Sequence, residues 1–85
     1  MSLMWLYDSF QPYCERNGIK LLADDMRFIA KHLSYIPAER HKVVMMQYLD
    51  EWKAGMDGNC LPLARMNTGR RAANAYLRDA VDGKI

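Results

Sequence analysis

The residues of this chain that are suited to chemistry are two histidines, two cysteines and two adjacent acidic pairs. His32 and His41 stand on either side of Pro37, and paired histidines can transfer protons or respond to pH. No serine, cysteine or carboxylate accompanies them at the spacing of a catalytic triad. We therefore interpret both histidines as exposed or half-buried side chains of helices.

Cys14 and Cys60 are the only cysteines. As a nucleophile, Cys14 would need a neighbouring base and a group that orients it, and the sequence supplies neither. We expect both thiols to be free and to serve as small apolar side chains in a reducing cytoplasm. Two cysteines and two histidines without ligand spacing do not indicate a zinc site, so neither a metal nor another cofactor is expected.

The acidic pairs are Asp24-Asp25 and Asp50-Glu51. Neighbouring residues of a helix diverge by about 100°, so the two carboxylates of each pair cannot share a proton. We interpret both pairs as solvated helix surfaces. With no acid, base or nucleophile converging, the sequence predicts no enzyme and no small-molecule substrate.

These side chains are expected to lie on helices, because the kinds of apolar residue in the chain are typical of an all-α fold. Nine Ala, nine Leu and seven Met outweigh three Val, four Ile and one Thr, and β-branched residues are the ones that sheets favour. A chain of 85 residues has room for one hydrophobic core. Its net charge of +2 does not decide its partners, and no apolar run approaches the roughly 20 residues that span a bilayer.

The predicted fold is a small orthogonal or up-down helical bundle, with three main helices and a short N-terminal helical segment. Pro12 interrupts the first segment, and Pro37 separates the second helix from the third. Asn67 is a suitable N-cap for the last helix, which leaves residues 57–65 as a loop. The expected helices are 4–17, 20–35, 37–56 and 68–81.

The third predicted helix has more apolar surface than one contact needs. Its main stripe is built on Met45, Leu49 and Trp52, yet Val43 and Met46 lie away from that stripe. Two interpretations remain open. Either the helix is central and the rest of the bundle surrounds it, or Val43 and Met46, together with the N-terminal aromatics such as Trp5, form a surface for a protein partner or a second copy.

The last segment, residues 65–85, has five basic and two acidic side chains, a net charge of +3. Arginine and asparagine on an exposed helix can contact phosphates and base edges, and residues 67–71 would offer an anion-binding helix N-terminus. An ordinary solvated helix face is the competing interpretation. The candidate nucleic-acid-binding residues are Arg70, Arg71, Asn74 and Arg78.

Three short stretches, at residues 35–41, 48–52 and 67–78, read Tyr-Ile-Pro-Ala-Glu-Arg-His, Tyr-Leu-Asp-Glu-Trp and Asn-Thr-Gly-Arg-Arg-Ala-Ala-Asn-Ala-Tyr-Leu-Arg. In them the chain resembles small, uncharacterised helical proteins encoded in bacteriophage and prophage genomes, over residues 29–81. The resemblance implies a bacterial or phage cytoplasmic setting and a small accessory role. It carries no catalytic residue to this chain.

The function that the sequence favours is therefore a non-enzymatic accessory or adaptor protein. It would act by binding a protein partner or by forming a homodimer, through Val43, Met46 and Trp5. The alternative is a small nucleic-acid-binding protein that uses the arginines of the last helix.

Overall fold

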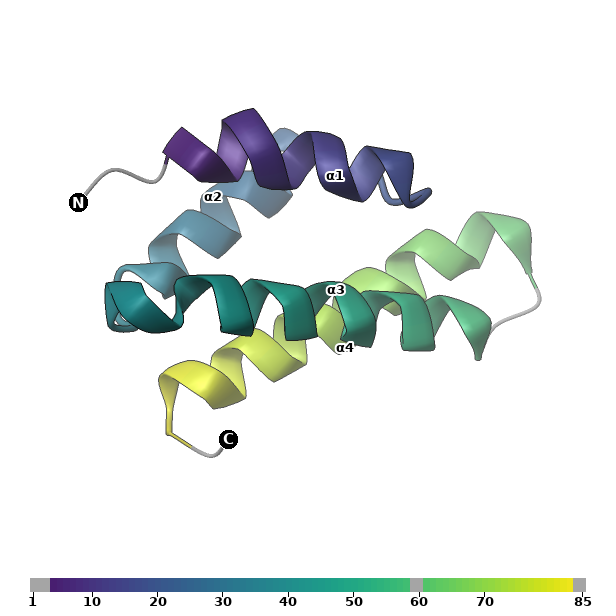
Figure 1. The fold of residues 1–85 in the computed structure, drawn as a ribbon. Coiled ribbons are helices and arrows are strands. Elements are labelled where there is room, and N and C mark those ends of the chain that lie inside the picture. Colours follow the sequence, from purple (N-terminus) through teal and green to yellow (C-terminus); the bar gives the residue numbers. More distant parts are fainter. Residues whose placement is uncertain (1–3, 59–60, 84–85) are drawn as a thin grey trace.

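The computed structural model describes residues 4–58 and 61–83, and within them it contains helices and no strand. The predicted all-α bundle is thus confirmed. In Figure 1, α3 runs across the middle of the molecule, α4 crosses it, the N-terminal helical segment lies above α3, and α2 passes behind and also contacts α4. The elements are a π-helical turn Leu6–Phe10, α1 Gln11–Arg16, α2 Ala23–Leu33, a 3-10 turn Ala38–Arg40, α3 His41–Asp57 and α4 Pro62–Val81.

The N-terminal helical segment, residues 4–16, contains one wider, π-helical turn just before Pro12, the residue that was expected to interrupt it. The backbone N–H of Gln11 donates to the carbonyl of Leu6, five residues earlier. Proline lacks an N–H, and its ring would clash with the carbonyl four residues before it in a regular α-helix. A single π-turn relieves that conflict, so the interruption takes the form of a wider turn and the chain stays helical.

Gly18 ends this segment. Its φ of +79° lies in the left-handed region that glycine adopts without strain. The N–H of Gly18 donates to the carbonyl of Glu15 and that of Ile19 to the carbonyl of Cys14, which is the Schellman arrangement. Cys14 and Ile19 are both buried, so the turn also fixes the first helix against the core.

The buried side chains form one cluster between the helices. The expected inner stripe of α3 is confirmed for Met45, Leu49 and Trp52, all of which are buried. Leu22 falls within the expected helix 20–35 but is exposed, because it precedes α2 in extended conformation. The cluster comprises Leu6, Phe10, Cys14, Ile19, Leu21, Met26, Ile29, Leu33, Ile36, Val44, Met45, Tyr48, Leu49, Trp52, Ala73, Leu77 and Ala80.

The last helix starts six residues earlier than expected, at Pro62 and not at residue 68. Proline is favoured in the first helical turn, where its missing N–H is no loss. The carbonyl of Leu61 accepts the N–H groups of Ala64 and Arg65, so the first helical bonds form there. Asn67 therefore lies inside α4, and the anion-binding helix N-terminus expected at residues 67–71 does not exist.

α3 and α4 form the most extensive contact between helices, and two glycines allow it. A Cβ on Gly55 would lie 2.9 Å from the Cα of Gly69, and a Cβ on Gly69 would lie 2.7 Å from Nε1 of Trp52. Both distances are shorter than real Cβ contacts. The two backbones can approach this closely, and cover the indole ring, only because no side chain stands between them.

Gly69→Ala should therefore lower the stability of the domain. The added methyl group overlaps a buried ring and backbone and not a flexible side-chain end, so we expect a loss of about 1–3 kcal/mol in urea unfolding. Gly58→Ala is the matched control, since its added Cβ meets nothing closer than 3.7 Å and its φ of −77° suits alanine. Equal stability of the two variants would contradict the close crossing.

Candidate functional site

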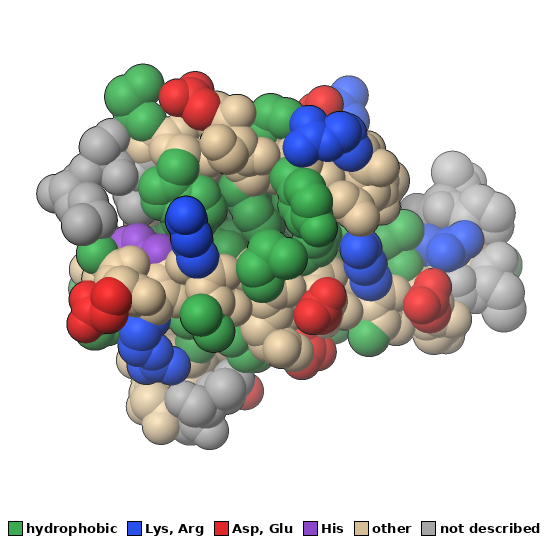
Figure 2. Space-filling model, in the orientation of Figure 1, with side chains coloured by type: hydrophobic (Ala, Val, Ile, Leu, Met, Phe, Trp, Pro, Cys, Tyr) green, Lys and Arg blue, Asp and Glu red, His purple; other side chains and the backbone are tan. Residues whose placement is uncertain are grey.

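An apolar groove of about 410 Å³ lies between the N-terminal helical segment and α3. Figure 2 shows it as a hollow with hydrophobic side chains on its floor and walls and basic side chains at its rim. We call it the N-terminal groove. It is lined by Trp5, Ser9, Phe10, Tyr13, Arg16, Lys42 and Met46.

The π-turn helps to line up the aromatic wall of this groove. A wider turn brings residues five apart closer to one face of the helix than regular α-helical spacing does. Trp5 and Phe10 accordingly make an edge-to-face contact, with ring centroids 6.2 Å apart. Further along the segment, the guanidinium of Arg16 lies 5.8 Å from the centroid of the Tyr13 ring.

α3 supplies the opposite wall from its outer side. Val43 is 71% exposed and Met46 is 47% exposed, whereas Val44 and Met45 between them are buried. The sequence left open whether the rest of the bundle surrounds the whole helix. It does not, since Val43 and Met46 are exposed. Met46 and Trp5 line the same groove, and Val43 lies on α3 one turn before Met46.

A buried ion pair on the other side of α3 was missed by sequence reasoning. Asp25 is 4% exposed, and its two oxygens accept hydrogen bonds from Nε and Nη2 of Arg70 at 2.6 and 3.1 Å. The second oxygen also accepts the backbone N–H of Leu22 at 2.9 Å, at the start of α2. The expectation that Asp25 belongs to a solvated face is wrong, because its carboxylate satisfies both an arginine and a helix terminus.

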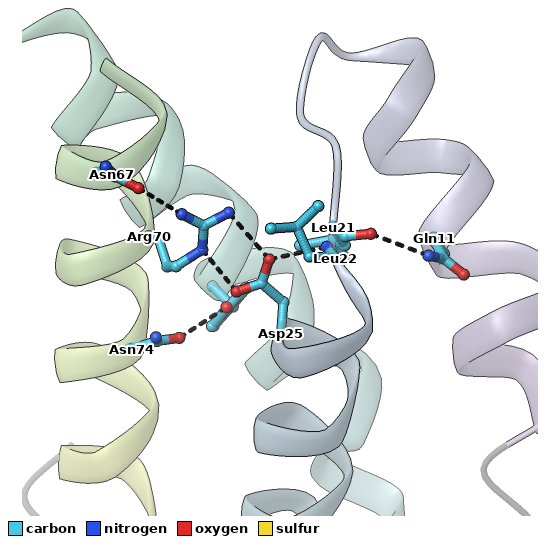
Figure 3. A network of polar contacts seen from close by, with 8 residues as sticks. Gln11, Leu21, Leu22, Asp25, Asn67, Arg70 and Asn74 are labelled. Carbon is cyan, nitrogen blue, oxygen red and sulfur yellow. Dashed lines mark hydrogen bonds and ion pairs between the residues drawn. The ribbon is translucent and has the colours of Figure 1, made fainter. Parts of the chain in front are cut away.

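The same network reaches the other helices (Figure 3). The Arg70 guanidinium lies 5.2 Å from the centroid of the Trp52 ring and donates through Nη1 to Asn67 Oδ1 at 2.6 Å. The Tyr48 hydroxyl donates to Asn74 Oδ1 at 2.8 Å. A signal for Asp25 was present in the sequence, since an acidic residue at the third helical position often binds the backbone N–H of the N-cap.

These contacts change the candidate nucleic-acid surface. Arg70 and Asn74 are held by the network within the bundle, while Arg71 and Arg78 remain exposed on α4. The four residues therefore do not form one exposed face. No observation favours nucleic-acid binding over an ordinary solvated helix surface with two arginines.

The two histidines bind backbone carbonyls and not each other. His41 is buried, contrary to expectation, and its Nε2 lies 2.9 Å from the carbonyl oxygen of Leu33 and 2.7 Å from that of Ile36. The ring thereby joins the start of α3 to the last residue of α2 and to the turn that follows it. His32 is half-buried, as expected, and stacks on Phe28 at 4.0 Å while its Nδ1 meets the Phe28 carbonyl.

Cys14 is a free, buried thiol. Burial raises its pKa to about 12, with Lys53 acting weakly in the opposite direction, so it carries almost no thiolate near neutral pH. Cys60 lies outside the described residues. Burial likewise raises the pKa of Tyr48, and the nearby Asp25 adds to the shift.

Among the described residues, no three His, Cys, Asp or Glu side chains are grouped so that they could hold a metal ion. No helix in this part of the chain has the length and hydrophobicity needed to cross a membrane. The chain matches no protein-family model, and comparisons with curated proteins and with solved structures give no match.

Asp25→Ala should destabilise the fold strongly, because it leaves the Arg70 guanidinium, only 23% exposed, without its carboxylate. Breaking a buried pair in this way costs about 3–5 kcal/mol. The neighbouring Asp24 pairs with Arg27 at the surface, so Asp24→Ala should cost no more than about 1 kcal/mol. Urea unfolding measures the stability of both variants. Similar decreases in the free energy of unfolding would show that the Asp25–Arg70 pair contributes no more than the surface pair.

Cys14 should resist alkylation in the folded domain. A rise of its pKa from 9.0 to about 12 lowers the thiolate fraction at pH 8 about a thousandfold, and burial blocks access as well. In a Cys60→Ser background, iodoacetamide labelling followed by mass spectrometry should be slow in buffer and complete in urea. Rapid labelling in buffer would mean that Cys14 is accessible and reactive.

Proposed function

We propose that this chain is a non-enzymatic accessory module that binds another protein through the N-terminal groove and the adjoining Val43. The observation that carries the proposal is the groove itself. Trp5, Phe10, Tyr13 and Met46 come together in it from two separate helical segments. Single exposed apolar residues are ordinary on a protein surface, whereas a concave apolar site lined by aromatic rings can receive the apolar side chains of a partner.

The kinds of side chain support a protein partner. Aromatic rings bury a large area at low entropic cost and are common anchors of interfaces. Methionine is unbranched and polarizable, so Met46 can adapt to the shape of an incoming side chain. Val43 extends this apolar surface along α3, outside the groove.

The residues suited to chemistry support a role without catalysis, since packing already uses most of them. The carboxylate of Asp25 is occupied by Arg70, Cys14 is buried, and both histidine rings contact backbone carbonyls. We assign the module to a bacterial or phage cytoplasmic setting. The support for that assignment is the resemblance of the segments around Pro37 and along α4 to small phage proteins.

Val43→Lys with Met46→Lys should leave the domain folded and abolish partner binding, because two charges would have to be desolvated in the interface. Circular dichroism checks the fold, and quantitative mass spectrometry of captured proteins measures binding. Arg71→Ala with Arg78→Ala, on α4, is the control and should retain the partner.

Two results would change this proposal. A double-lysine variant that unfolds, or that captures the same proteins as the wild type, would contradict it. A wild-type dimer in sedimentation that the lysine substitutions dissociate would identify the partner as a second copy of this chain.

A further inference from the structure

The N-terminal groove has cations on both walls. Arg16 comes from the N-terminal helical segment and Lys42 from α3, and no carboxylate stands among the described residues that line the hollow. In Figure 2 the acidic side chains of this face lie around the groove and not in it. The groove therefore offers apolar contact at its floor and positive charge at its rim.

Both cations are available to a partner. The described part of the chain contains ion pairs at Arg27, Arg65 and Arg70, but none at Arg16 or Lys42. Arg16 is exposed and lies near the Tyr13 ring, a contact that leaves its N–H groups open to an acceptor. Lys42 is exposed at the first turn of α3.

This charge pattern is unfavourable for a second copy seated in the groove. In a two-fold dimer the same surface meets itself, so the cations of one protomer would approach those of the other. Like charges brought together in a desolvated interface oppose association. A partner with carboxylates at these positions would instead gain charge-assisted hydrogen bonds.

We propose that the N-terminal groove binds an acidic amphipathic helix of another protein. This inference rests on the proposed function and names the partner chemistry of the same site. Two helical walls with an apolar floor suit a third helix, whose anchors at positions i, i+3 or i+4 and i+7 enter the hollow. Carboxylates on either side of those anchors face Arg16 and Lys42.

Two synthetic helical peptides test the proposal. Both carry the same leucine and phenylalanine anchors at helical spacing; one is flanked by glutamates and the other by lysines. Fluorescence anisotropy with the wild-type domain should show the glutamate peptide binding at least about tenfold more tightly, a preference that shrinks as salt rises. Equal affinity, or a preference for the lysine peptide, would overturn the inference and leave the proposed function standing.

Substitutions place the preference in the groove. Arg16→Glu with Lys42→Glu should reverse the preference for the glutamate peptide. Arg16→Gln with Lys42→Gln should abolish this preference, and as the milder change it serves as the test if the glutamate variant does not fold. Arg71→Glu with Arg78→Glu makes the same change in net charge on α4 and should leave the preference intact. If the α4 variant lost the preference for the glutamate peptide and the groove variants kept it, the assignment of the binding site to the N-terminal groove would be wrong.

Binding of neither peptide to the wild type would also overturn the inference. The proposed function would then be judged by the separate capture experiment, which depends on Val43 and Met46 and not on the charge of the partner. Self-association of the wild type that becomes stronger in Arg16→Gln with Lys42→Gln would assign the groove to a second copy and overturn the inference.

Discussion

The pairing of Asp25 with Arg70 over the face of Trp52 is the interaction on which the arrangement of the helices depends. It joins the start of α2 to the middle of α4 and covers the largest buried side chain of α3. A carboxylate this deeply buried is tolerated only because the guanidinium and the Leu22 N–H satisfy both of its oxygens. Three helices are thus held in one register around a single ring.

The close crossing of α3 and α4 has a consequence for the opposite side of α3. Gly55 and Gly69 bring the two backbones together, so α4 covers the inner stripe of α3 and leaves its outer residues to the N-terminal helical segment. That segment is tied to α3 near its end, where Lys53 Nζ donates to Asn17 Oδ1 at 3.0 Å. Between these fixed regions the side chains do not close over α3, and the N-terminal groove remains.

Part of the candidate site could be predicted from sequence. The third predicted helix has apolar residues outside its main stripe, and these are Val43 and Met46. They could be identified from the sequence because the helical period alone decides which residues share a face. The other wall could not be predicted in the same way. Phe10, Tyr13 and Arg16 belong to a segment whose turns are shifted by the π-turn, and only its packing angle against α3 brings them opposite Lys42 and Met46.

The sequence by itself determined the helical class and the inner stripe of α3, since helix propensities and apolar periods act over a few neighbouring residues. Only the tertiary structure decided which arginine is paired and which acid is buried. Asp25 and Arg70 are 45 residues apart, and although the third helical position marks Asp25 as a partner for the N-cap N–H, nothing local indicates that it pairs with Arg70. The distinction arises when α2 and α4 dock, because a charge that leaves water must find its partner there.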